Sequence, residues 1–239
     1  MRYSFFICVG SLLLIAAVVF LLLVGCGPID LARSLTDESG VVENLSAAAY
    51  FGALIVCVYR LLADKVVSKR YLVILWSAAL FLFLGEETSW LQHFFSYGSP
   101  EFFKDYNFQR EVNLHNLSFW NAPAWLGCFR VGDIDYRIFF SSANLFRVAF
   151  TLYFLIFPIL CHVVIDDFFL RKRLYVVLPD RLFLAVTWLV IGLSILMTVY
   201  GPIEKLKPLS ETREMLYAFV IFFYCTFYLK NSCLHSCTL

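Results

Sequence analysis

The chain has 239 residues, of which 61% are hydrophobic and 15% are charged. Soluble domains carry about 45–50% apolar and about 25% charged residues, so the composition excludes an ordinary water-soluble domain and is typical of a membrane protein. The formal net charge is +1, which gives no basis for nucleic acid as a partner. The eight cysteines show no CxxC pair, and we expect neither a disulfide framework nor a cysteine-bound zinc ion.

Hydropathy predicts six membrane-spanning helices, because about 20 consecutive apolar residues cross a bilayer. The expected spans are about 5–25, 42–62, 71–94, 138–165, 182–200 and 210–230. The fold class that follows is an all-α membrane protein, a single multi-pass domain over residues 1–239. The lipid bilayer is its first expected partner, and other membrane proteins are further candidates.

The first span has two interpretations. Residues 23–26, Leu-Val-Gly-Cys, resemble the cleavage box of a lipoprotein signal that would end at Cys26. The apolar core of a signal peptide is about 7–15 residues long, and the run over residues 5–25 is longer. A retained helix is therefore the first expectation, and a lipoprotein signal is the alternative.

Basic residues predict the orientation in the membrane. Lysine and arginine in short loops mark the cytoplasmic side. They crowd the second and fourth connecting loops, at Arg60, Lys65, Lys69, Arg70, Arg171, Lys172, Arg173 and Arg181. We expect both termini to be cytoplasmic and the long loop after the third span to lie outside.

Three charged residues fall inside predicted spans. Glu86 and Glu87 lie near the outer end of the third span, and Arg147 lies about nine residues into the fourth. An ionisable residue at such a depth faces a partner or a water-filled cavity, so we expect Arg147 to pair with Glu86 or Glu87. One alternative is an ion pair that only fixes the register of two helices. The second carboxylate would still need a proton, a metal or another cation.

The outer loop adds a second group of polar side chains. Ser99, Pro100 and Glu101 predict the start of a short amphipathic helix, with an N-cap, a first-turn proline and a first-turn acid. On such a helix Glu111 and His115 are four residues apart and share a face. The polar residues of this run also alternate as in a strand, which would again put Glu111 and His115 on one side.

Glu111 and His115 allow three interpretations. A carboxylate and an imidazole at this spacing can ligate one metal ion. They can also act as a base and the group that orients it. The third alternative is a simple hydrogen bond on a surface helix. Two further acids, Glu211 and Glu214, begin the sixth span, where they either complete an acidic ring or only favour the helix N-terminus.

The central stretch resembles a known group of proteins. The pattern is Glu86-Glu87-x-Ser89-Trp90-x-Gln92, then Ser99-Pro100-Glu101, then Asn107-x-Gln109-x-Glu111-x-Asn113-Leu114-His115-Asn116. It is similar to that of uncharacterised bacterial multi-pass inner-membrane proteins, and the likeness covers the first half of the chain. The resemblance implies a bacterial inner-membrane location and supplies no activity.

Three hypotheses for function follow. The first is a metal-dependent enzyme acting on a lipid or envelope precursor at the outer face, with a divalent metal as candidate cofactor. Its candidate metal ligands or acid–base groups are Glu86, Glu87, Glu111 and His115, and Arg147 would hold a phosphate or carboxylate of the substrate. The second is a non-catalytic accessory protein of an envelope assembly, and the third is a carrier coupled to a proton or an ion. No P-loop, nucleophile elbow or dinucleotide fingerprint supports another chemistry.

Overall fold

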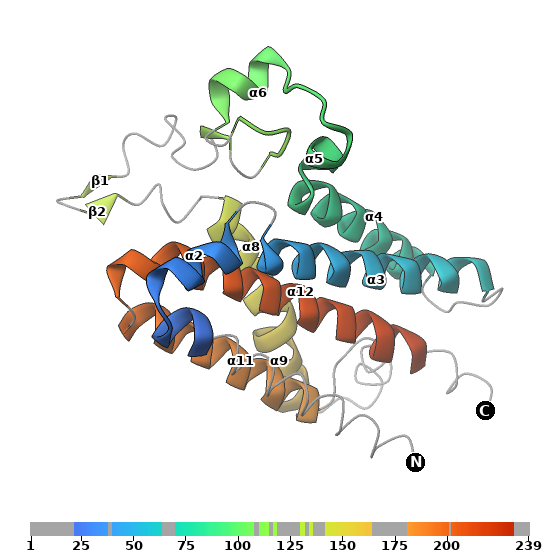
Figure 1. Ribbon diagram of the computed structural model, residues 1–239. Helices are drawn as coiled ribbons and strands as arrows, with labels where there is room; N and C mark the ends of the chain where they lie inside the picture. Colours follow the sequence, from blue (N-terminus) through green and yellow to red (C-terminus); the bar gives the residue numbers. More distant parts are fainter. Residues whose placement is uncertain are drawn as a thin grey trace, which may run out of the picture.

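A computed structural model gives the fold of this protein (Figure 1). It describes residues 22–37, 40–63, 70–107, 110–114, 117–118, 130–131, 134–135, 142–163, 181–200 and 202–231. The helices of the bundle are α2 (Ile29–Thr36), α3 (Val41–Ala63), α4 (Arg70–Glu87), α8 (Ser142–Thr151), α9 (Phe157–Val163), α11 (Arg181–Tyr200) and α12 (Leu206–Asn231). The described part of the chain is therefore all-α, apart from a hairpin of two-residue strands, β1 (Arg130–Val131) and β2 (Ile134–Asp135).

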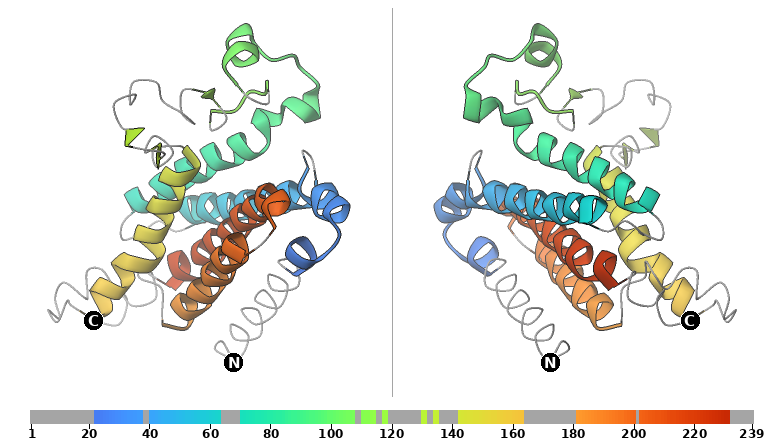
Figure 2. Two further views of the ribbon diagram at one scale, coloured as in Figure 1. Left: turned by 90° about the vertical axis from the view of Figure 1, so that its left-hand side faces the viewer. Right: turned by 90° about the vertical axis from the view of Figure 1, so that its right-hand side faces the viewer.

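The long helix α12 forms the centre of the bundle. It lies between α3 and α11 in both the first view and the side views (Figures 1 and 2). Gly52 brings α3 close to it, since a Cβ there would lie 2.8 Å from the Phe222 ring. Because α12 is covered by neighbouring helices, apolar side chains such as Ala218, Ile221 and Tyr224 are almost fully buried.

Aromatic contacts show how the helices are directed. Phe83 of α4 packs on Tyr50 of α3 and on Phe146 of α8, with ring centroids 5.6 and 5.3 Å apart. Phe146 in turn lies 6.0 Å from the ring of Tyr217 of α12. These residues lie toward the C-terminal end of α4 and the N-terminal halves of the other three helices. We call this end of the bundle the polar end.

A second aromatic layer lies farther from the polar end. The Trp76 ring packs on Tyr153 and Tyr224, with centroids 5.5 and 5.4 Å away. The hydroxyls of Tyr153 and Tyr224 are 2.8 Å apart and share a hydrogen bond. Tyr153 lies in a π-helical turn, η4 (Leu152–Ile156), which joins α8 to α9. Pro158 follows this turn and has no N–H to donate to the carbonyl of residue 154, which favours the local change in hydrogen bonding.

The segment before α2 packs on the start of α12. Val24 is fully buried against Ala32 and Leu209. The ammonium group of Lys205, itself only 7% exposed, donates to the backbone carbonyls of Gly25, at 3.0 Å, and of Gly27. The residues around Cys26 therefore belong to the folded bundle.

The outer faces of the bundle are apolar. Large hydrophobic side chains are exposed on α3, α4, α8–α9 and α11, including Phe51, Ile55, Tyr59, Leu62, Tyr71, Leu75, Phe81, Val148, Leu152, Leu160, Trp188, Leu196 and Tyr200. Soluble monomers rarely expose contiguous apolar surface on this scale. Within the described residues, one stretch, Ile29–Ala63, which contains α3, is long and apolar enough to cross a membrane. Two shorter apolar helical stretches are Asn144–Leu160 and Phe183–Leu193.

The all-α prediction is thus confirmed, while the number of six spans is not. Helices α3, α11 and α12 match predicted apolar segments, and the predicted span 138–165 contains the helical run 142–163. Residues 5–21 of the first predicted span lie outside the described residues. The third predicted span was too long, because α4 ends at Glu87 rather than near Phe94.

Candidate functional site

The chain leaves α4 through a strained turn. Ser89, Trp90 and Leu91 have φ angles of 44°, 55° and 65°, a left-handed conformation that residues other than glycine seldom adopt. The turn folds the Trp90 indole back onto Gly85, where a Cβ would lie 2.8 Å from the ring. The indole Nε1–H then donates a 3.1 Å hydrogen bond to Oε1 of Glu86. Strained backbone of this kind persists only where the surroundings hold it, and here the following loop does so.

We call residues 88–118 the polar loop. It contains the short helices η1 (Ser89–Leu91), α5 (Gln92–Phe95) and α6 (Glu101–Tyr106), and it lies beyond the end of α4 (Figure 1). Glu86 ties this loop to α4, because its Oε2 accepts a 2.6 Å hydrogen bond from the backbone N–H of Leu114. Both carboxylate oxygens of Glu86 are therefore used in holding the loop.

Glu111 is buried at the centre of the polar loop, with 6% of its surface exposed. Its Oε2 accepts hydrogen bonds from the Ser89 hydroxyl and, at 3.2 Å, from Nδ2 of Asn113. The Asn107 amide adds a further link, since its Nδ2 donates to the Asn113 carbonyl at 2.8 Å. A buried carboxylate needs such donors to offset its loss of hydration.

Gln92 and Ser99 close the network on the other side. The Gln92 amide donates to the Ser99 hydroxyl at 2.8 Å and accepts from the backbone N–H of Val112 at 2.8 Å. The Ser99 hydroxyl donates to the backbone carbonyl of Arg110. The amide, hydroxyl and carboxyl side chains of this stretch thus bond across the loop.

The predicted geometry of the polar loop is one residue off at the start of its helix and wrong further on. Helix α6 begins at Glu101 with Pro100, not the predicted Ser99, at its N-cap, and it ends at Tyr106, after which Asn107 is extended. Residues 110–114 form bends rather than a helix or a strand, and Arg110 has a φ of 59°. The reason is that the Asn107 side chain bonds to the backbone and the side chain of Asn113, which competes with regular structure. His115 lies outside the described residues, so its pairing with Glu111 stays a prediction.

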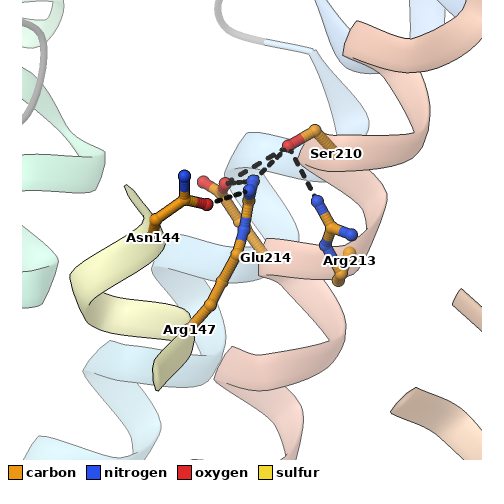
Figure 3. Close-up of polar contacts among 5 residues, drawn as sticks. All are labelled: Asn144, Arg147, Ser210, Arg213 and Glu214. Atoms are coloured by element: carbon orange, nitrogen blue, oxygen red, sulfur yellow. Dashed lines mark hydrogen bonds and ion pairs between the residues drawn. The ribbon is translucent and has the colours of Figure 1, made fainter. Parts of the chain in front are cut away.

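Arg147 belongs to a different group of residues. Its guanidinium donates from Nη1 to Oδ1 of Asn144, at 2.9 Å, and from Nη2 to the Ser210 hydroxyl, at 2.6 Å (Figure 3). The same Nη2 forms an ion pair with Oε1 of Glu214 at 3.2 Å. The prediction that Glu86 or Glu87 is its partner is therefore wrong, because α12 reaches Arg147 from the other side of the bundle.

Arg213 completes what we call the arginine cluster, Asn144, Arg147, Ser210, Arg213 and Glu214. It is only 9% exposed and donates from Nη2 to the Ser210 hydroxyl at 3.4 Å. The Nε atoms of Arg147 and Arg213 are both buried and have no hydrogen-bond partner among the described residues. Ser210 and Arg213 were not among the residues expected from the sequence to form a site. The signal was the position of Ser210, three residues before Arg213 and four before Glu214, which lets its hydroxyl meet both side chains on α12.

Glu87 is the last residue of α4, at the polar end of the bundle. The carboxylates of Glu87 and Glu214 both lie close enough to the buried Tyr50 hydroxyl to interact with it electrostatically. Acidic groups from α4 and α12 thus meet over α3 at the polar end of the bundle. Within the described residues, no three His, Cys, Asp or Glu side chains are placed to hold a metal ion. Glu86, Glu87 and Glu111 therefore do not form a metal site by themselves, and the predicted set depends on His115.

Comparison with protein-family models, with curated proteins and with solved structures finds no match in any of the three. The resemblance of the central stretch to bacterial inner-membrane proteins stays an expectation from the sequence.

Proposed function

We propose that this protein is an integral protein of the bacterial inner membrane that binds an anionic lipid or envelope precursor at its polar end, near the outer leaflet. In this proposal several helices of the bundle contact lipid, and the polar loop is a rigid cover over the polar end. The arginine cluster supplies the positive charge that an anionic headgroup needs.

One observation carries the proposal. The helices around α12 expose apolar side chains, while the cluster's charged groups gather, partly or fully buried, at one end of the bundle. This arrangement suits a hydrocarbon environment, in which ionisable residues face the bundle interior and mark functional sites. A water-soluble bundle would instead place its apolar side chains inside and its charges outside.

The carboxylates of the polar loop support binding more than metal catalysis. Glu86 and Glu111 each accept two hydrogen bonds that hold the loop. These bonds give both carboxylates a structural role that needs no metal ion. The same network favours the second candidate, a non-catalytic accessory protein of an envelope assembly, in which the loop presents a fixed surface to another membrane protein.

Native mass spectrometry of the purified protein tests the proposal. The full chain would be extracted from bacterial membranes in a neutral detergent and analysed for bound lipid and for metal content. We expect retained anionic lipid and a membrane fraction that resists carbonate washing. A protein that washes off the membrane, or that carries neither lipid nor precursor, would contradict the proposal. Stoichiometric metal that disappears in His115→Ala and Glu111→Gln would restore the metalloenzyme hypothesis.

A further inference from the structure

The arginine cluster holds more positive than negative charge. It contains two guanidinium groups, Arg147 and Arg213, and one carboxylate, Glu214, which leaves a formal charge of +1. Arg147 donates to the Glu214 carboxylate. Within the described residues, the only hydrogen bond of the Arg213 side chain is the one to Ser210. An unpaired charge is costly to bury, and Arg213 is about nine-tenths buried.

The Ser210 hydroxyl lies where the two guanidinium groups converge. It accepts a hydrogen bond from Arg147 at 2.6 Å and another from Arg213 at 3.4 Å, so a neutral oxygen lies where two cations meet (Figure 3). In the part of the chain that the structure describes, the buried Nε atoms of both arginines have no hydrogen-bond partner. A charged oxygen would suit these donors better than a hydroxyl does, because it would also offset the buried guanidinium charge, which a neutral oxygen cannot.

We propose that Arg213, Arg147 and Ser210 form a binding site for a phosphate group, carried by a lipid headgroup or present as free phosphate. This inference rests on the proposed function and names the ligand chemistry of its anionic partner. The planar fork of arginine matches the oxygens of phosphate, and two forks with a hydroxyl between them match a tetrahedral group. Glu214 keeps Arg147 in place and leaves Arg213 as the cation that the ligand neutralises.

Thermal unfolding of the full-length protein in neutral detergent tests the site. The probes are inorganic phosphate, phosphatidic acid, phosphatidylglycerol and, as the neutral control, phosphatidylcholine, all at matched ionic strength. We expect the unfolding midpoint of the wild type to rise by roughly 5–10 °C at saturating phosphate-bearing probe. A response to inorganic phosphate identifies free phosphate as a ligand, while a response to the anionic lipids alone identifies a headgroup.

The Arg213→Met variant distinguishes binding at this site from anion binding elsewhere on the protein. The variant removes a buried unpaired charge, so without a probe it should unfold at the same temperature as the wild type or higher. With phosphatidic acid or phosphate its midpoint should not change. Arg33→Met is the matched control, since it removes the same charge from an exposed position on α2 and should keep the full response.

Two results would overturn the inference. One is a wild type whose midpoint does not respond to phosphate or to either anionic lipid. The other is an Arg213→Met variant that responds as strongly as the wild type. If the variant still carries anionic lipid in native mass spectrometry, the proposed function stands and the ligand lies elsewhere. If the wild type carries none, the proposed function fails as well.

Discussion

The backbone N–H of Leu114 donates a 2.6 Å hydrogen bond to the carboxylate of Glu86, across 28 residues of chain. This bond joins the end of α4 to the far side of the polar loop. The same carboxylate accepts from the Trp90 indole, so one side chain fixes both the turn out of the helix and the return of the loop. The polar loop therefore depends on Glu86 for its position relative to the bundle.

Substitution of Glu86 should loosen the polar loop. We expect Glu86→Ala to lower the free energy of unfolding by about 1.5–3 kcal/mol, the usual contribution of a hydrogen bond to a charged group. Glu86→Gln should cost less, because its amide oxygen still accepts one of the two bonds. Limited proteolysis within residues 88–118, with chemical denaturation alongside, measures both effects. Glu101→Gln, at an exposed position on α6, is the control, and an equal effect there would contradict the assignment.

Glu111 distinguishes a structural from a catalytic role. Glu111→Ala would leave the buried Ser89 hydroxyl without its acceptor, at a cost of about 1–3 kcal/mol, and would leave the Asn113 amide with only its 3.3 Å bond to the Ser89 hydroxyl. Glu111→Gln should recover much of this stability. Denaturant unfolding of both variants measures the difference. A Glu111→Gln protein of wild-type stability that has lost a cellular phenotype would instead indicate chemistry at this carboxylate.

Substitution of Gly85 tests the strained turn directly. A Cβ at this position would lie 2.8 Å from the Trp90 ring, so Gly85→Ala should push the indole away and break its bond to Glu86. The expected cost is about 1–3 kcal/mol, as for other overpacked sites, with a shift in tryptophan fluorescence. Gly192→Ala is the matched control. Among the described residues, no atom apart from its chain neighbours and the local helix backbone lies within 4 Å of its Cβ position, and alanine in the interior of α11 should add about 0.5–1 kcal/mol of stability. Equal destabilisation by both substitutions would contradict the role of Trp90.

Much of the fold could be predicted from the sequence, because apolar runs of helical length are a strong local signal. The bounds of α3, α11 and α12 follow it within a few residues, and the start of α6 follows from Pro100 and Glu101. The helix α2 was not predicted and lies in an expected loop, because eight residues are too few to show a clear helical periodicity.

The candidate site was only partly predictable. Glu86 and Glu111 were singled out from the sequence, and the structure gives both hydrogen bonds that hold the polar loop, Glu86 from α4 and Glu111 from within the loop, while their roles as ligands or acid–base groups stay a prediction. The predicted partner of Arg147 was wrong because the sequence suggests pairing within the hairpin of the third and fourth spans, whereas Glu214 is 67 residues away along the chain, on another helix. Packing decides which helices become neighbours, and the hydrophobic pattern of one helix does not show which other helix it will contact.

The ion pair between Arg147 and Glu214 gives the last prediction. Their side chains are 27% and 33% exposed, so the pair is only partly screened by solvent. Glu214→Gln removes the one carboxylate of the arginine cluster and leaves two guanidinium groups facing each other, so we expect it to lower the free energy of unfolding by about 1.5–3 kcal/mol. Arg147→Met should cost less, because Glu214 keeps a bond to Ser210 and remains near Arg213.

A double-mutant cycle with Arg147→Met and Glu214→Gln should give a coupling energy of about 0.5–3 kcal/mol. Chemical denaturation in detergent measures it, with Glu204→Gln, an exposed acid before α12, as the control for lost negative charge. Strictly additive costs would contradict a direct pair. A coupling that falls when phosphatidic acid is added would show that a bound phosphate competes with Glu214 for Arg147, because the two anions then share one set of donors.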